Sequence, residues 1–149
     1  MKRLFTLVVC FAMAWPSVAR DVDIDLESPK WLTQAREAIE QKNYGLAINV
    51  LTQANEQQSA DWHNLMGFSL RLNSPPQLLR AEQHYQAALE KDPVHLGALE
   101  YYGELLLMKN DWAGAQTMLK RLELACPAGC EELRDLQKDV ADFKAKKRP

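Results

Sequence analysis

The fold is decided by residues 81–93, which read AEQHYQAALEKDP. Small residues stand at Ala81 and Ala88, and Pro93 closes the stretch. Similar residues return 34 positions to either side: Ala47 and Ala115 match Ala81, Ala54 and Leu122 match Ala88, and Ser59 and Pro127 match Pro93. A 34-residue period with small residues inside two successive helical patterns is typical of a helix–turn–helix unit that stacks. One such unit cannot bury its apolar face alone, so neighbouring copies must cover one another.

Working outward, the pattern predicts three pairs of helices. Their expected ranges are 28–41 with 44–57, 61–72 with 75–91, and 93–109 with 112–125. We expect a capping residue followed by proline to start one helix of each pair, because a side-chain oxygen can accept from the free amides and proline is tolerated at the first helical position. The three expected caps are Ser28-Pro29, Ser74-Pro75 and Asp92-Pro93.

A last amphipathic helix is predicted from about Glu131. Its apolar residues share one face, which suits a helix that covers the open end of the stack. They are Leu133, Leu136, Val140 and Phe143. The expected architecture is an all-α, right-handed helical solenoid of three helix–turn–helix repeats plus a C-terminal capping helix, with repeats at 28–59, 60–93 and 94–127 and the capping helix and basic tail at 128–149.

These positions resemble the tetratricopeptide repeat (TPR). The matching residues are Trp31, Ala35, Tyr44, Ala47, Leu51 and Ala54 in repeat one, Gly67, Leu70, Ala81, Tyr85, Ala88 and Pro93 in repeat two, and Leu99, Tyr102, Gly103, Trp112, Ala115, Leu119, Leu122 and Pro127 in repeat three. We expect Gly67 and Gly103 to be small because the two helices of a repeat cross closely there. The stretches 97–105 (GALEYYGEL) and 126–132 (CPAGCEE) are also similar to a group of small exported bacterial TPR proteins.

The first 19 residues predict a secretory signal peptide. Lys2 and Arg3 precede an apolar run from 4 to 15, and residues 17–19 (SVA) form a small-x-small cleavage site. Residues 20–27 alternate acidic and apolar side chains and are expected to form a flexible arm. We therefore expect an exported, periplasmic protein without a membrane span after cleavage.

The charge balance excludes an obvious nucleic-acid binder. Of 18 basic residues, removal of Lys2 and Arg3 leaves 16 against 20 acidic ones, a net charge of −4. Nucleic-acid-binding domains carry clustered positive charge instead. No phosphate loop, nucleophile elbow or paired metal-ligand histidines occur in the sequence, so we expect no catalytic residues, no cofactor and no enzyme activity.

The TPR resemblance implies a partner-binding concave face lined by the first helix of each repeat. The candidate partner-binding residues are Arg36, Asn64, Phe68, Arg71, Glu100 and Glu104. Recognition of a terminal carboxylate needs converging cations, and two glutamates stand where such cations would be wanted. A protein or peptide partner with both signs of charge and an apolar anchor near Phe68 is expected, while oligomeric state and partner identity stay open.

Cys126 and Cys130 flank a three-residue turn before the last helix. In an exported protein an even number of mature cysteines indicates a disulfide, here one that would fix the angle of the capping helix. The alternative is a copper or zinc site, or a thiol-redox site, in which His95 joins the two sulfurs. The sequence predicts an adaptor or scaffold that mediates protein–protein interaction, with metal or thiol handling as the alternative.

Overall fold

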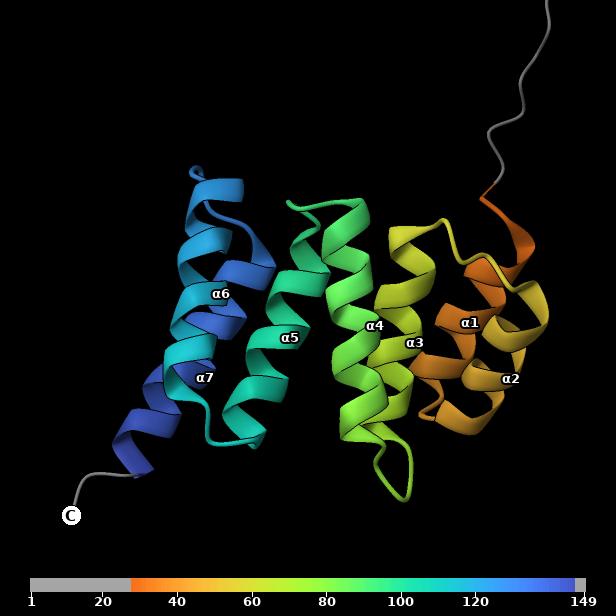
Figure 1. Cartoon of the computed structure of the whole chain (residues 1–149), viewed down its shortest axis with the longest axis horizontal. Coiled ribbons are helices and arrows are strands. Elements are labelled where there is room, and N and C mark those ends of the chain that lie inside the picture. Colours follow the sequence, from red (N-terminus) through yellow and green to blue (C-terminus); the bar gives the residue numbers. More distant parts are fainter. Residues whose placement is uncertain (1–27, 147–149) are drawn as a thin grey trace, which may run out of the picture.

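The computed structural model describes residues 28–146, which form seven α-helices and no strand. The helices are α1 (Lys30–Glu40), α2 (Tyr44–Ala54), α3 (Ala60–Leu72), α4 (Leu78–Lys91), α5 (Leu96–Met108), α6 (Trp112–Ala125) and α7 (Glu131–Lys146). Figure 1 shows the pairs α1–α2, α3–α4 and α5–α6 in order along the long axis of the molecule, with α7 beside α6. The predicted all-α fold class is confirmed. The predicted signal peptide (1–19) and acidic arm (20–27) lie outside the described residues.

Consecutive helices pack as three hairpins and a terminal helix. Helix α1 packs on α2, α3 on α4, and α5 on α6, while α7 packs on both α5 and α6. Each hairpin also touches the next, through contacts of α2 with α3 and of α4 with α5. The last helix buries Leu136 completely and Val140 almost completely. Each unit thus supplies the cover that its neighbour lacks, as the 34-residue period predicted.

The repeated alanines occupy equivalent environments. Ala47, Ala81 and Ala115 lie in the second helix of each hairpin, and each is 0% exposed. A larger side chain at these fully buried positions would overpack the core. The spacing that decided the fold therefore corresponds to three matching helix crossings.

The two glycines at the predicted crossings meet different neighbours. A Cβ on Gly67 would lie 2.8 Å from Cε1 of Tyr85 on α4, so α3 and α4 do cross closely there. A Cβ on Gly103 would lie 2.6 Å from Cδ2 of Leu136 on α7. The expectation that Gly103 admits the second helix of its own repeat was wrong, because α7 fills the space against α5.

The cap-then-proline expectation was also wrong at all three sites. Pro29 itself is the first flanking residue of α1, and its carbonyl, not the Ser28 side chain, accepts from Leu32. In the loop after α3, the backbone N–H of Gln77 donates to the carbonyl oxygen of Leu70. Helix α4 therefore begins after Gln77 rather than at Ser74-Pro75.

At the third site the aspartate caps a turn instead of the helix. Oδ1 of Asp92 accepts from the amide of Val94, two residues on. His95 takes the capping position of α5, where its Nδ1 accepts from the amide of Ala98 at 3.1 Å. This places an imidazole, rather than a carboxylate, at the start of α5.

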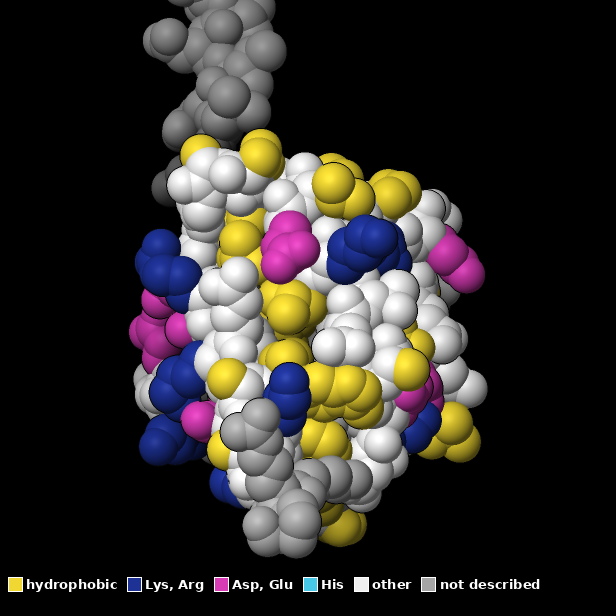
Figure 2. Space-filling model, turned by 90° about the vertical axis from the view of Figure 1, so that its left-hand side faces the viewer, with side chains coloured by type: hydrophobic (Ala, Val, Ile, Leu, Met, Phe, Trp, Pro, Cys, Tyr) yellow, Lys and Arg dark blue, Asp and Glu magenta, His cyan; other side chains and the backbone are white. Residues whose placement is uncertain are grey.

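Two clusters of buried side chains form the core. One cluster contains side chains from each of the helices α1 through α5 and includes Leu51, Leu70 and Tyr85. The other contains side chains from α4 through α7 and includes Leu99, Leu122 and Leu136. Figure 2 shows the end of the stack nearest α6 and α7, where hydrophobic side chains form a strip between charged ones. No helix among residues 28–146 combines the length and apolar character needed to cross a membrane.

Candidate functional site

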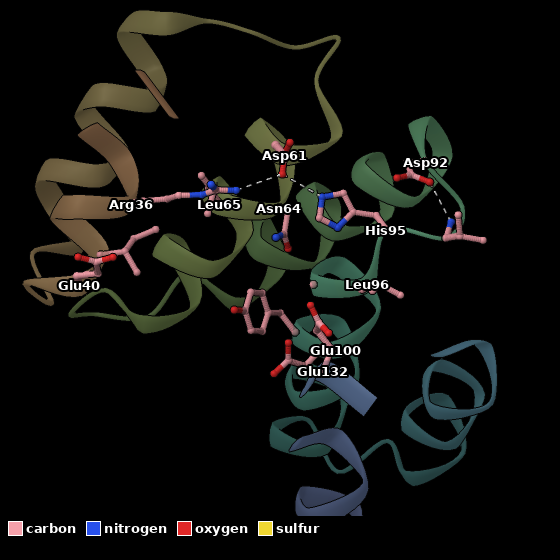
Figure 3. A pocket seen from close by; sticks show the side chains of 14 residues that line it. Arg36, Glu40, Asp61, Asn64, Leu65, Asp92, His95, Leu96, Glu100 and Glu132 are labelled. Carbon is pink, nitrogen blue, oxygen red and sulfur yellow. Dashed lines mark hydrogen bonds and ion pairs between the residues drawn. The ribbon is translucent and has the colours of Figure 1, made fainter. Parts of the chain in front are cut away.

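A groove of about 640 Å³ crosses the face made by the first helices of the hairpins. We call it the acidic groove, because it is lined by five carboxylates but by one arginine and one histidine. Its lining residues are Arg36, Ile39, Glu40, Asp61, Asn64, Leu65, Asp92, Val94, His95, Leu96, Gly97, Glu100, Tyr101 and Glu132. They come from α1, α3, α5, α7 and the loop before α5, so all three hairpins contribute to one site (Figure 3).

Asp61 links the three hairpins at the rim of the groove. Its Oδ1 lies 3.9 Å from a guanidinium nitrogen of Arg36 and 3.4 Å from Nε2 of His95 (Figure 3). Because Nδ1 of His95 accepts from the start of α5, a neutral His95 carries its proton on Nε2, facing Asp61. Exposed pairs of this kind add little stability, so the main effect is to orient the side chains around the groove.

The wall of the groove holds two buried polar side chains. Glu100 is 7% exposed and Asn64 is 6% exposed, and Oδ1 of Asn64 has no hydrogen-bond partner. Gly97 permits this packing, since a Cβ there would lie 3.0 Å from Nδ2 of Asn64. Buried polar groups are normally satisfied, and an unsatisfied one calls for an explanation.

Burial raises the pKa of Glu100 to about 8, because water no longer solvates its charged form. The negative charges of Glu104, Asp135 and Glu132 add to this rise, and the positive charge of Arg71 opposes it. In the free protein Glu100 is therefore largely protonated at neutral pH.

A second groove of about 320 Å³ lies beside the acidic groove, toward the C-terminal half of α7. It is lined by Arg71 and Glu104, whose Nη2 and Oε2 atoms lie 2.5 Å apart. The guanidinium of Arg71 also lies 5.4 Å from the ring centre of Phe68 and 5.7 Å from that of Tyr101. The cation is thus paired and covered by aromatic rings, as is typical of a buried arginine.

The six predicted partner-binding residues divide among three environments. Arg36, Asn64 and Glu100 line the acidic groove, whereas Arg71 and Glu104 pair with each other beside it. Phe68 lines neither groove and packs between the rings of Tyr44 and Tyr101. The aromatic ring at the acidic groove is that of Tyr101.

Among the groove residues missed as partner-binding candidates are Asp61, Glu132 and His95. Asp61 lies one helical turn before Asn64, so the spacing of the predicted residues along α3 pointed to it. Glu132 belongs to the CPAGCEE stretch, and only the packing of α7 on α5 brings it to the groove. His95 was considered as a metal ligand, but it caps α5 and faces Asp61.

The two cysteines lie at disulfide-bonding distance, with 2.18 Å between the sulfurs of Cys126 and Cys130. They lie at the end of α6 and immediately before α7, and Gly129 between them has a φ of +89°. Among residues 28–146, no three His, Cys, Asp or Glu side chains gather in a way that could hold a metal ion.

His63 of α3 and His84 of α4 lie together. Their Nδ1 atoms are 3.0 Å apart and their rings pack against Trp62. One Nδ1 donates and the other accepts, so the pair shares a single proton at this contact. Burial, reinforced by the neighbouring His63, lowers the pKa of His84 to about 4.

No protein-family model matches the chain, and no curated protein is similar to it at a significant level. Among solved structures, the chain is similar to the type III secretion translocator chaperone SycD of Yersinia enterocolitica, with a TM-score of 0.67 and 17% sequence identity. The match covers 78% of this chain and 83% of the SycD chain. The likeness shows a TPR-like helical repeat fold.

Proposed function

We propose that this chain is an exported, periplasmic adaptor or chaperone that binds a segment of a partner protein in the acidic groove. The main support for this proposal is that a single groove is lined by side chains from all three hairpins and from α7, with Asn64 and Glu100 buried in its wall. Sites that span several repeats are the usual binding surfaces of stacked helical repeats.

The comparison with SycD supports a non-enzymatic role. SycD is a translocator chaperone, and this chain resembles it over most of its length at low identity. Fold likeness alone does not transfer an activity, so the support comes from its agreement with the groove.

Export is proposed from the sequence of residues 1–19 and from the cysteines. Disulfides persist in oxidising compartments such as the bacterial periplasm, and the Cys126–Cys130 pair lies at bonding distance. The similarity of 97–105 and 126–132 to small exported TPR proteins points the same way. Fractionation of cells should find the protein in the periplasm, with the mass of a chain that starts at Arg20. A cytoplasmic protein with the mass of the full chain would refute export.

The binding proposal is tested by capture of partners from the cell envelope with matched charge reversals. Glu132→Lys places a cation in the groove, and Glu123→Lys makes the same change at an exposed position on α6. A protein captured by wild type and by Glu123→Lys, but at least tenfold less by Glu132→Lys, supports the groove. Equal capture by all three, with unchanged helicity, rules out the groove as the binding surface.

A further inference from the structure

Hydrogen-bond acceptors from three helices converge at the inner end of the acidic groove. Asn64 comes from α3, Glu100 from α5 and Glu132 from the first turn of α7. Figure 3 shows the carboxylates of Glu100 and Glu132 close together, in agreement with the repulsion of Glu100 by Glu132. Three acceptors that approach from different directions match the three donors of an ammonium group.

These acceptors have no cation of their own within residues 28–146. Arg36 pairs with Asp61 at the rim, and Arg71 pairs with Glu104. Glu100 has no ion pair there, although it is almost wholly buried. Asn64 also lines the groove, and its buried Oδ1 has no hydrogen-bond partner. Asn64 Oδ1 therefore lacks the donor that a buried acceptor requires, and Glu100 lacks a counter-ion among the described residues.

The same groove also has apolar side chains in its lining. Ile39, Leu65, Leu96 and Tyr101 line the same groove. A lysine side chain has a four-carbon stem that packs on apolar surface and a compact charged head. The acceptors and the walls together thus suit a lysine entering end-on.

We propose that the inner end of the acidic groove binds a primary ammonium group, and that its occupant is a lysine side chain of the partner segment, held by Glu100, Glu132 and the amide of Asn64. This rests on the proposed function and names the chemistry that the groove selects. Such an ammonium site, built from acceptors, is opposite in charge to a site that recognises a carboxylate with converging cations.

A lysine fits better than an arginine or a carboxylate. A guanidinium needs a planar, bidentate partner, whereas these acceptors come from three separate helices. An acidic segment would meet five carboxylates across the groove. Residues 20–27 of this chain carry four carboxylates, which makes them a poor occupant for the same reason.

Binding is coupled to loss of a proton from Glu100. The free carboxyl holds its proton because it is buried and because Glu104, Asp135 and Glu132 repel its charge, with Arg71 opposing them. A lysine ammonium replaces that proton with a fixed positive charge. The affinity should therefore rise between about pH 6 and pH 8, by at most about tenfold per pH unit for release of one proton.

The test uses small probes and the ¹⁵N-labelled protein, followed through the side-chain signal of Asn64 and the amide signal of Gly97. The main probe is Nα-acetyl-lysine methylamide. Nα-acetyl-norleucine methylamide has a similar stem without charge, the acetyl-arginine analogue carries a guanidinium, and norleucine methylamide offers only an α-amine. We expect saturable shifts with the lysine probe alone, at millimolar concentration.

Matched variants assign the shifts to the acceptors. Glu100→Gln should lower the affinity for the lysine probe at least tenfold at about pH 8. It should also remove the pH dependence of that affinity, because Gln resembles the protonated acid. Glu132→Gln should weaken it about threefold, since that carboxylate is more exposed and better screened. The control Glu123→Gln on α6 should leave the affinity unchanged.

Several outcomes overturn the inference. Equal shifts with the norleucine probe, tighter binding of the arginine probe, or full affinity in Glu100→Gln and Glu132→Gln would each refute an ammonium site. Stronger shifts with the free α-amine would assign the site to a chain terminus instead of lysine. Loss of partner capture in Glu132→Lys without any lysine-probe binding would refute this inference and leave the proposed function standing. Binding of the lysine probe together with unchanged partner capture in Glu132→Lys would refute the groove as the partner surface and leave the ammonium site standing.

Discussion

Gly103 of α5 lies directly against Leu136 of α7, and a Cβ on the glycine would approach Cδ2 of Leu136 to 2.6 Å. Leu136 is 0% exposed, so its side chain has little room to move. The close approach of α7 to α5 depends on the missing side chain at position 103. The same packing brings Glu132, one turn before Leu136, to the acidic groove.

Gly103→Ala should therefore destabilise the protein, and the sign should reverse when Leu136 is shortened. Overpacking costs about 1–3 kcal/mol, partly offset by about 1 kcal/mol of helix propensity. In a Leu136→Ala background the clash is gone, so Gly103→Ala should increase the free energy of unfolding. Denaturant unfolding of the four proteins of this cycle checks it, and equal effects in both backgrounds would contradict the contact.

The stacking of the helices could be predicted from the sequence because small residues mark helix crossings that recur at a fixed period. The starts of α2, α6 and α7 also match the predicted ranges, but the capping residues expected at the starts of α1, α4 and α5 do not cap those helices. Ser28, Ser74 and Asp92 had the chemistry of caps, but local hydrogen bonds of the loops moved the helix starts to the residues after Pro29, Gln77 and His95. A cap motif states a preference, and the loop geometry that overrides it is set by tertiary contacts.

Removal of the cation from the buried Arg71–Glu104 pair should be strongly destabilising. Arg71→Met leaves the Glu104 carboxylate buried without its partner, which is expected to cost about 3–5 kcal/mol. Glu104→Gln in the same chain should recover most of that loss. Urea unfolding near pH 8 measures both, and a double variant no more stable than Arg71→Met would contradict the pairing.

Burial also makes the Arg71→Met effect depend on pH. Burial raises the pKa of Glu104 despite the opposing charge of Arg71, so removal of Arg71 should raise it further. A carboxyl with a raised pKa is neutral at low pH, where the missing cation matters less. The loss of stability in Arg71→Met should thus be smaller near pH 5 than near pH 8, and an unchanged difference would show that charge is not the cause.

The candidate site was predictable in part. The TPR resemblance assigned Arg36, Asn64 and Glu100 to the concave face, and these three residues line the acidic groove. Whether a residue on that face is free or already paired depends on its neighbours in space. Arg71 and Glu104 show this limit, because they lie on different helices and only the packing of α3 on α5 reveals that they pair with each other.

Glu100→Gln should stabilise the protein at alkaline pH. The folded-state pKa of Glu100, about 8, lies above the ordinary value of 4.5, so its contribution to stability is fully present below about pH 4.5 and is lost as the pH rises toward 8. The neutral glutamine avoids this loss. The difference in unfolding free energy between Glu100→Gln and wild type should therefore grow by no more than about 1.4 kcal/mol per pH unit. Unfolding curves from about pH 5 to pH 8.5 test it, and parallel curves would contradict a raised pKa.

The cysteines should resist alkylation until a reductant is added. Purified protein treated with iodoacetamide should gain no label at Cys126 or Cys130, and reduction should expose both. Because the closed loop is short, Cys126→Ser with Cys130→Ser should lower the unfolding free energy by less than the ~3 kcal/mol estimated for a fifteen-residue loop. Free thiols with stoichiometric bound copper or zinc would instead favour the metal-handling alternative.

The histidine pair should make the protein sensitive to acid. The pKa of His84 is lowered to about 4 from 6.5, chiefly by burial, and that of His63 is lowered in the same direction. A histidine whose folded pKa is depressed contributes stability that is complete above about pH 6.5 and is lost as the pH falls toward 4.

His84→Gln should reduce this acid loss, because glutamine has no proton to gain in the unfolded chain. The difference from wild type should grow by at most about 1.4 kcal/mol per pH unit between about pH 6.5 and pH 4. Ring-proton titration by NMR gives the direct measurement, with a midpoint near pH 4 expected for His84. A midpoint near 6.5, or equal acid sensitivity in the variant, would mean that the two imidazoles do not share one proton in a buried contact.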